Sequence, residues 1–219
     1  MFDNLTKFVI WTIPTNAGES LTLMAAILLG LSQLPIVPVQ VLWINMATTL
    51  FLGLMLVFEP KEPDLMRRPP RATSSPIVTS ALLLRTIVVA ALILAGAFGL
   101  FVWQQSRGTP VEEARTAVVN LIVLVEAGYL FACRSLTRSF WELGLLTNPL
   151  LLVGVAITLA VQAIFTYWRP ANRLFESAPI GWDSWLAAFA MALLVFIAIE
   201  SEKGVRRRLK RLQGLSDLG

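Results

Sequence analysis

Two glutamates lie inside long apolar stretches of this sequence, where an ionised side chain is costly to hold. Glu19 lies near the middle of the stretch 8–31, and Glu126 lies near the middle of the stretch 116–133. A carboxylate surrounded by hydrocarbon is rare in proteins and commonly serves ion or proton movement. Both acids therefore predict a site for a cation or a proton. For Glu126 the sequence leaves one alternative open, a protonated acid that hydrogen-bonds a neighbouring helix.

Amide and hydroxyl side chains accompany these acids at helical spacing. Asn16 precedes Glu19 by three residues, and Asn45 precedes Thr48 by three, with Thr49 next to it. Residues three apart share one face of a helix. Their oxygens would suit a hard cation such as sodium or calcium, or a proton carried on a glutamate. The alternative is that these side chains only hydrogen-bond one membrane helix to another.

The composition excludes several other kinds of chemistry. The 219 residues are 56% apolar and only 15% charged, and they include no histidine and a single cysteine, Cys133. An internal disulfide is impossible, and the commonest transition-metal ligand is missing. The formal charge is +4, but the basic residues lie between apolar stretches and not on one surface, so no nucleic-acid partner is expected.

The apolar stretches have the length of membrane-spanning helices, each of which needs roughly 20 apolar residues. We expect a single all-α membrane domain over 1–219, a bundle of six transmembrane helices in the lipid bilayer. Pro35 and Pro38 interrupt the first long stretch and divide it into a hairpin of two spans. The predicted spans are 8–31, 39–58, 81–103, 116–133, 149–168 and 182–200.

The distribution of basic residues predicts the orientation. Lys and Arg are concentrated in the segment 59–76, in the loop after the fourth span and in the segment 201–219. Cytoplasmic segments carry this excess in membrane proteins. We therefore expect both termini on the cytoplasmic side, with 59–76 as a cytoplasmic loop in water and 201–219 as a basic cytoplasmic tail.

Two motifs resemble a known family. The pattern P-x-Q-x-L-W-x-N spans Pro38 to Asn45, and F-E-P-x-E-P-D-x-M-x-R-P-P-R spans Phe58 to Arg71. Together they resemble the fifth and sixth transmembrane helices, and the loop that follows, of P2-type cation-transporting P-type ATPases. The segment CRSLTRS, 133–139, is similar to the end of the eighth helix. The resemblance covers the whole chain and implies the transmembrane helices five to ten of such a pump.

The resemblance also implies a set of metal ligands. In calcium pumps of this family the fifth helix supplies Asn and Glu, which match Asn16 and Glu19. The sixth supplies Asn, Thr and Asp, matched here by Asn45 and Thr48, whereas Thr49 stands where the Asp would be. Glu126 is similar to the ligand of the eighth helix. One carboxylate fewer leaves calcium, sodium and a proton all open as the transported cation.

The motifs for phosphorylation, dephosphorylation and nucleotide binding are absent from this sequence. The resemblance therefore implies a transport module that is not an enzyme on its own and has no catalytic residue or resident cofactor. ATP and magnesium are expected only on the N-terminal half of the pump, the expected partner, which holds helices one to four and the cytoplasmic domains. The alternative is a non-catalytic membrane protein that packs against or regulates a pump. The expected location is the plasma membrane.

Overall fold

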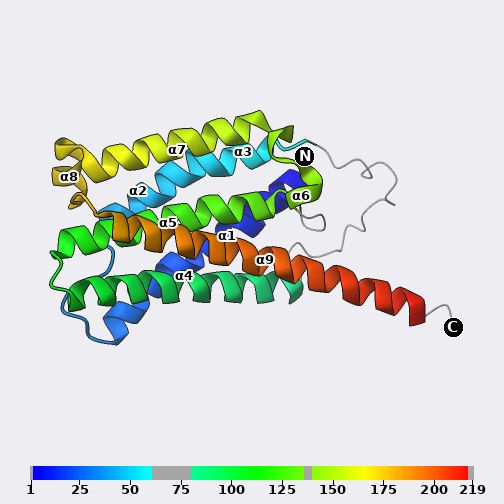
Figure 1. Cartoon of the computed structure of the whole chain (residues 1–219), viewed down its shortest axis with the longest axis horizontal. Helices are drawn as coiled ribbons and strands as arrows, with labels where there is room; N and C mark the ends of the chain where they lie inside the picture. The colour runs from blue at the N-terminus through cyan, green and yellow to red at the C-terminus, as the bar shows by residue number, and fades with distance from the viewer. Residues whose placement is uncertain (1, 61–79, 136–139, 217–219) are drawn as a thin grey trace.

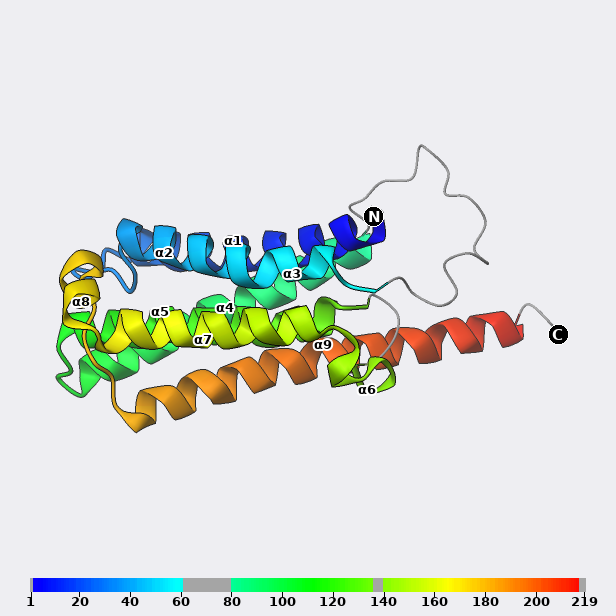
Figure 2. The same ribbon diagram turned by 90° about the horizontal axis from the view of Figure 1, so that it is seen from above.

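Long helices run side by side along one axis, and both termini lie at the same end of the bundle (Figures 1 and 2). The computed structural model describes residues 2–60, 80–135 and 140–216. Within these ranges there is no strand, so the all-α prediction is confirmed. The elements are α1 (Phe2–Leu28), α2 (Pro38–Thr48), η1 (Thr49–Gly53), α3 (Leu54–Val57), α4 (Ser80–Ser106), α5 (Val111–Cys133), α6 (Phe140–Leu143), η3 (Leu145–Thr147), α7 (Pro149–Tyr167), α8 (Arg169–Phe175) and α9 (Trp182–Ser216).

Five stretches of the described chain are long and apolar enough to cross a membrane. They are Pro38–Val57, Leu82–Ser106, Val111–Cys133, Pro149–Tyr167 and Trp182–Arg206. The chain is therefore an all-α, multi-pass membrane protein. Helix α1 is outside this set because its polar and charged residues lower its hydropathy, although its 27 residues would extend about 40 Å. It packs on α4 and α5 and crosses them obliquely (Figure 1), and its crossing of the membrane stays a prediction.

Helix α5 is the centre of the bundle. In its most apolar stretch 89% of the residues are buried, against 22% to 39% for the other four candidate spans. It packs on α1, α2, α4, α7 and α9. A helix that is apolar all around is suited to such a position, since every face meets another helix. Glu126 is consequently carried into the interior by the most buried of the five candidate spans.

The second predicted span is not one regular helix. After α2 ends at Thr48, five residues form the π-helix η1, and the short α3 completes the crossing. The N–H of Leu54 donates to the carbonyl of Thr49, five residues earlier, which is the hydrogen bond of a π-helix. The candidate span Pro38–Val57 agrees in extent with the predicted span 39–58. The sequence contains no proline or charge at the π-helical turn, which was not predicted.

Glu59 corrects the prediction of a solvated loop over 59–76. Its side chain is buried and forms an ion pair with Arg134, with 2.9 Å between Nε and Oε1. The side-chain amide of Asn148 donates to Glu59 Oε2 at 2.7 Å, and Asn4 donates to the Glu59 carbonyl at 2.7 Å. Both carboxylate oxygens therefore have partners, as burial of a charge requires. The rest of the predicted loop, 61–76, lies outside the described residues.

Most of the predicted basic tail, 201–219, is helical, and its cytoplasmic location stays a prediction. Helix α9 continues without interruption to Ser216 and extends past the end of the other helices (Figure 2). Its 35 residues correspond to about 52 Å, more than the hydrocarbon thickness of about 30 Å. Buried Lys203 holds the extension by donating to the carbonyl of Ala132 at 2.5 Å and to Glu200 at 2.6 Å. Residues 217–219 lie outside the described range.

Candidate cation site

Three helices bring the two mid-span glutamates together. Glu19 comes from α1 and Glu126 from α5, and each side chain is at most 2% exposed. The carboxyl group of Glu126 lies among the side chains of Glu19, Thr48 and Thr15. With Asn45 of α2, these residues form what we call the acid cluster: Thr15, Glu19, Asn45, Thr48 and Glu126. Residues separated by more than a hundred positions thus meet in the interior of the bundle.

Asn45 connects the first two helices of the acid cluster. Its side-chain amide donates to Oε2 of Glu19 at 2.9 Å and also to the carbonyl of Val41 at 3.1 Å. The amide nitrogen is thereby committed to two acceptors. The amide oxygen of Asn45 and Oε1 of Glu19 are the atoms left for another ligand, because Glu19 Oε1 is buried without a hydrogen-bond partner.

Glu126 is the least satisfied polar group in the described part of the chain. Both of its carboxylate oxygens are buried, and neither forms a hydrogen bond of regular geometry with the described residues, although the carboxyl group of Glu19 and the hydroxyls of Thr48 and Thr15 lie close by. A buried polar atom without a partner costs free energy. Three carboxylate oxygens in one place, two from Glu126 and one from Glu19, therefore form no regular hydrogen bond with the described residues.

Hydroxyl groups border the two acids. Thr48 is buried and donates to the carbonyl of Ile44 at 2.9 Å, and Thr15 is buried and lies within 3.2 Å of the carbonyl of Trp11. Because each hydroxyl donates to its own helix, its oxygen lone pairs remain available to a cation. Thr49 is partly buried at the start of η1.

The sequence analysis missed Thr15, although its position four residues before Glu19 places both on one face of α1. Asn16 is different. It is exposed on the outside of the described bundle, and the acid cluster forms without it. Of the six predicted ligands, the structure therefore brings Glu19, Asn45, Thr48 and Glu126 together, puts Thr49 at the adjoining turn and leaves Asn16 on an open face.

Two hydrogen bonds hold α1 against α5 beside the acid cluster. The indole nitrogen of Trp11 donates to the carbonyl of Glu126 at 3.0 Å. One turn further along α5, the hydroxyl of Tyr129 donates to the carbonyl of Ile10 at 3.0 Å. All of these side chains are buried. The spacing between Glu19 and Glu126 is thus determined by a double connection between their helices.

The donor set favours a hard cation. In the described residues, no three side chains of His, Cys, Asp or Glu come together as a transition-metal site would require. The acid cluster offers carboxylate, amide and hydroxyl oxygens, which are the ligands of calcium and sodium. The two carboxyl groups are also groups that can carry a proton.

The family described as "Cation transporting ATPase, C-terminus" matches residues 33–205 of this chain. Among curated proteins, the probable cation-transporting ATPase F of Mycobacterium tuberculosis is 48% identical over 202 residues, which cover 92% of this chain and 22% of the relative. The cation-transporting ATPase pma1 of Synechocystis is 34% identical over 208 residues, covering 91% of this chain and 23% of the relative.

Calcium-transporting ATPase 1 of Schizosaccharomyces pombe is more distant, with 29% identity over 208 residues that cover 95% of this chain and 23% of the relative. The chain therefore spans less than a quarter of the length of the curated relatives it matches. For each of these relatives the similarity covers more than nine-tenths of the chain.

Proposed function

Because this chain belongs to the family of cation-transporting ATPase C-terminal regions, we propose that it supplies part of the cation-binding site of an ATP-driven P-type pump. The resemblance indicated by the motifs at 38–45 and 58–71 is confirmed by the family match. In this proposal Glu19, Asn45, Thr48 and Glu126 bind the transported cation inside the membrane, with Thr15 as a further ligand. Thr49 and Asn16 complete the set from the adjoining turn and the open face.

One observation carries the proposal: among the described residues, three carboxylate oxygens of Glu19 and Glu126 meet in the interior of a membrane bundle without a regular hydrogen bond, with only hydroxyl and carboxyl groups beside them. Two carboxylates at close range repel one another when both are ionised, and burial makes each charge more costly. A cation between them would remove both costs at once. A purely structural role in joining helices would instead be expected to pair these oxygens with donors on the facing helices.

The two acids also limit the charge that the site can neutralise. Glu19 and Glu126 together balance one divalent ion, or one monovalent ion and a proton. Thr49 occupies the position at which the family's sixth helix carries an Asp, so one negative charge is missing. We propose calcium, sodium or a proton as the transported species, with a single divalent ion as the upper limit for calcium.

The energy for transport is proposed to come from the rest of the pump. The curated relatives are named as ATPases and are more than four times the length of their matched regions. We propose that an N-terminal half, with helices one to four and the cytoplasmic domains, provides the aspartyl-phosphate, ATP and magnesium chemistry. The lipid bilayer of the plasma membrane surrounds the assembled protein.

The test is cation-dependent ATP hydrolysis by the assembled pump carrying Glu19→Gln. Hydrolysis is measured against calcium, sodium and pH, and the cation to which the wild-type pump responds is used for comparison. The half-saturating cation concentration should rise at least about tenfold, because a neutral amide replaces a ligand of full negative charge. Glu112→Gln, an exposed acid at the start of α5, is the matched control and should bind as wild type.

An unchanged cation affinity in Glu19→Gln would overturn the proposal. That result, combined with co-purification of this chain with an intact pump, would support a non-catalytic regulatory protein instead.

A further inference from the structure

The π-helical turn η1 directly adjoins two proposed ligands. Thr48 is the residue before it, Thr49 is its first residue, and the N–H of Thr49 donates to the carbonyl of Asn45. A π-helix holds more residues in a turn than an α-helix, and single π turns occur frequently at functional sites. The exact path of this turn therefore determines where the ligands of α2 lie relative to α1 and α5.

Helix α7 contacts this turn through a glycine. A Cβ atom built on Gly154 would lie 2.0 Å from the carbonyl oxygen of Phe51 in η1 and 2.6 Å from Cγ of Met55. The Met55 side chain could rotate away, but a backbone oxygen moves only with its helix. Any larger residue at position 154 would therefore push η1 and α7 apart.

Two polar contacts extend the connection along the same helix. The indole nitrogen of Trp43 in α2 donates to Oε1 of Gln162 at 3.1 Å. At the other end, the side-chain amide of Asn148 donates to the carbonyl of Met55 in α3 at 3.3 Å. Helix α7 thus contacts the interrupted helix before, at and after the π turn.

The opposite side of the turn is equally crowded. A Cβ atom on Gly53 would lie 2.7 Å from Cε2 of Phe8 and 2.9 Å from Cζ3 of Trp11 in α1. Trp11 is itself held by its hydrogen bond to the Glu126 carbonyl. Because η1 lies between α1 and α7 with a glycine at each contact, a push from α7 is transmitted to the helix that carries Glu19.

We infer that Gly154 and Gln162 of α7 are positioning residues for the cation site, which fix the π turn and with it Asn45, Thr48 and Thr49. This inference rests on the proposed function. Neither residue is a proposed ligand. Their effect is on the geometry of the ligands, and in a site of close oxygen contacts a small displacement is sufficient to weaken binding.

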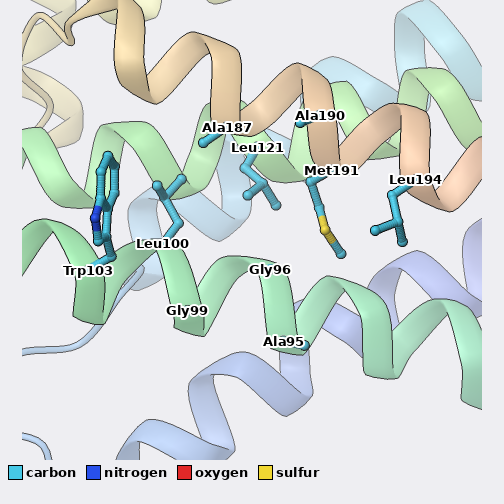
Figure 3. A pocket seen from close by; sticks show the side chains of 10 residues that line it. All are labelled: Ala95, Gly96, Gly99, Leu100, Trp103, Leu121, Ala187, Ala190, Met191 and Leu194. Carbon is cyan, nitrogen blue, oxygen red and sulfur yellow. The ribbon is translucent and has the colours of Figure 1, made fainter.

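The experiment compares two glycine substitutions in the assembled pump. Gly154→Ala should raise the half-saturating cation concentration about tenfold, while the maximal rate and the KM for ATP stay within about twofold of wild type. Gly96→Ala is the matched control. Gly96 also lies at a close contact of two membrane helices, but it faces the flexible side chain of Met191, 2.8 Å from the position of a Cβ, in the groove between α4 and α9 (Figure 3).

A normal cation affinity in Gly154→Ala would overturn the inference, as would an equal loss in Gly96→Ala. If Gly154→Ala does not fold, Gln162→Leu provides the decision, since it adds no bulk and removes only the contact with Trp43. It should lower the cation affinity at least about threefold, and unchanged affinity would again overturn the inference. Glu19→Gln in the same assay separates the two proposals. Unchanged cation affinity in Glu19→Gln would reject the cation site itself, whereas unchanged affinity in Gly154→Ala alone would reject only the positioning role of α7.

Discussion

The side-chain amide of Asn45 donates a hydrogen bond to Oε2 of Glu19 across 2.9 Å, and this bond joins α2 to α1 within the acid cluster. It uses one oxygen of the carboxylate and leaves the other, Oε1, buried without a hydrogen bond to the described residues. The two helices are consecutive in the chain, yet their polar faces meet only because α2 folds back beside α1 after the turn at 29–37. This bond leads to the first prediction.

Asn45→Ala should reduce cation affinity about five- to tenfold, equivalent to roughly 1 to 1.4 kcal/mol. The substitution removes one amide ligand and also frees Glu19 to turn away from the site. The measurement is the half-saturating cation concentration of the assembled pump, for Asn45→Ala, Glu19→Gln and the double variant. Because both residues act on one site, their effects should be less than additive. Full additivity would show that the bond has no role in binding.

Glu126→Gln should separate binding from stability. Glu126 is buried, and neither of its carboxylate oxygens forms a regular hydrogen bond with the described residues. Burial of this carboxyl group therefore destabilises the folded protein when no cation is bound. The amide should keep or raise the midpoint of thermal unfolding without cation, with about 2 to 4 °C gained for each kcal/mol. At the same time the cation affinity should fall at least about tenfold. A lower midpoint together with unchanged affinity would identify Glu126 as a structural residue.

Arg134→Leu should destabilise the protein by about 3 to 5 kcal/mol, because Glu59 would remain buried without its counter-ion. The double variant Arg134→Leu with Glu59→Leu should recover part of this loss, since it removes both charges. The control is Arg107→Ala, which breaks the half-exposed pair with Asp183 at 3.1 Å and should cost less than about 1 kcal/mol. Thermal unfolding in detergent measures all three, and equal losses for Arg134→Leu and Arg107→Ala would contradict the prediction.

Labelling of single cysteines tests the orientation of the bundle in the membrane. Cys133 is the only cysteine of this chain and is buried. A cysteine introduced at an exposed position of this chain should therefore react with a maleimide in its place. Ser32 lies in the connection between α1 and α2, Arg208 lies in the C-terminal part of α9, and both are exposed. These two segments lie at opposite ends of the bundle (Figure 2). A membrane-impermeant maleimide should label Ser32→Cys in intact cells, whereas Arg208→Cys should react only after permeabilisation. Labelling of both in intact cells would place the two on the same side.

Much of this protein is readable from local sequence. Runs of about 20 apolar residues require membrane helices, because the backbone must satisfy its own hydrogen bonds in lipid. Pro35 and Pro38 predicted the break between α1 and α2, which end and begin at Leu28 and Pro38. Glu19 and Glu126 were conspicuous for the same reason, since their burial in a membrane needs an explanation. Each of these inferences depends on a residue and its close neighbours in the chain.

Other features depend on contacts that no local pattern contains. The sequence of η1 is as apolar as a regular helix, and its π turn becomes understandable only beside Gly154, about a hundred residues later. Glu59 reads as part of a charged loop until Arg134 and Asn148 meet it. Asn16 and Thr15 are neighbours, yet the rotation of α1 against α5 exposes one and buries the other. Hydropathy and helical spacing thus determined which segments enter the membrane and which acids are unusual there, whereas side-chain packing between distant helices decided which oxygens face one another.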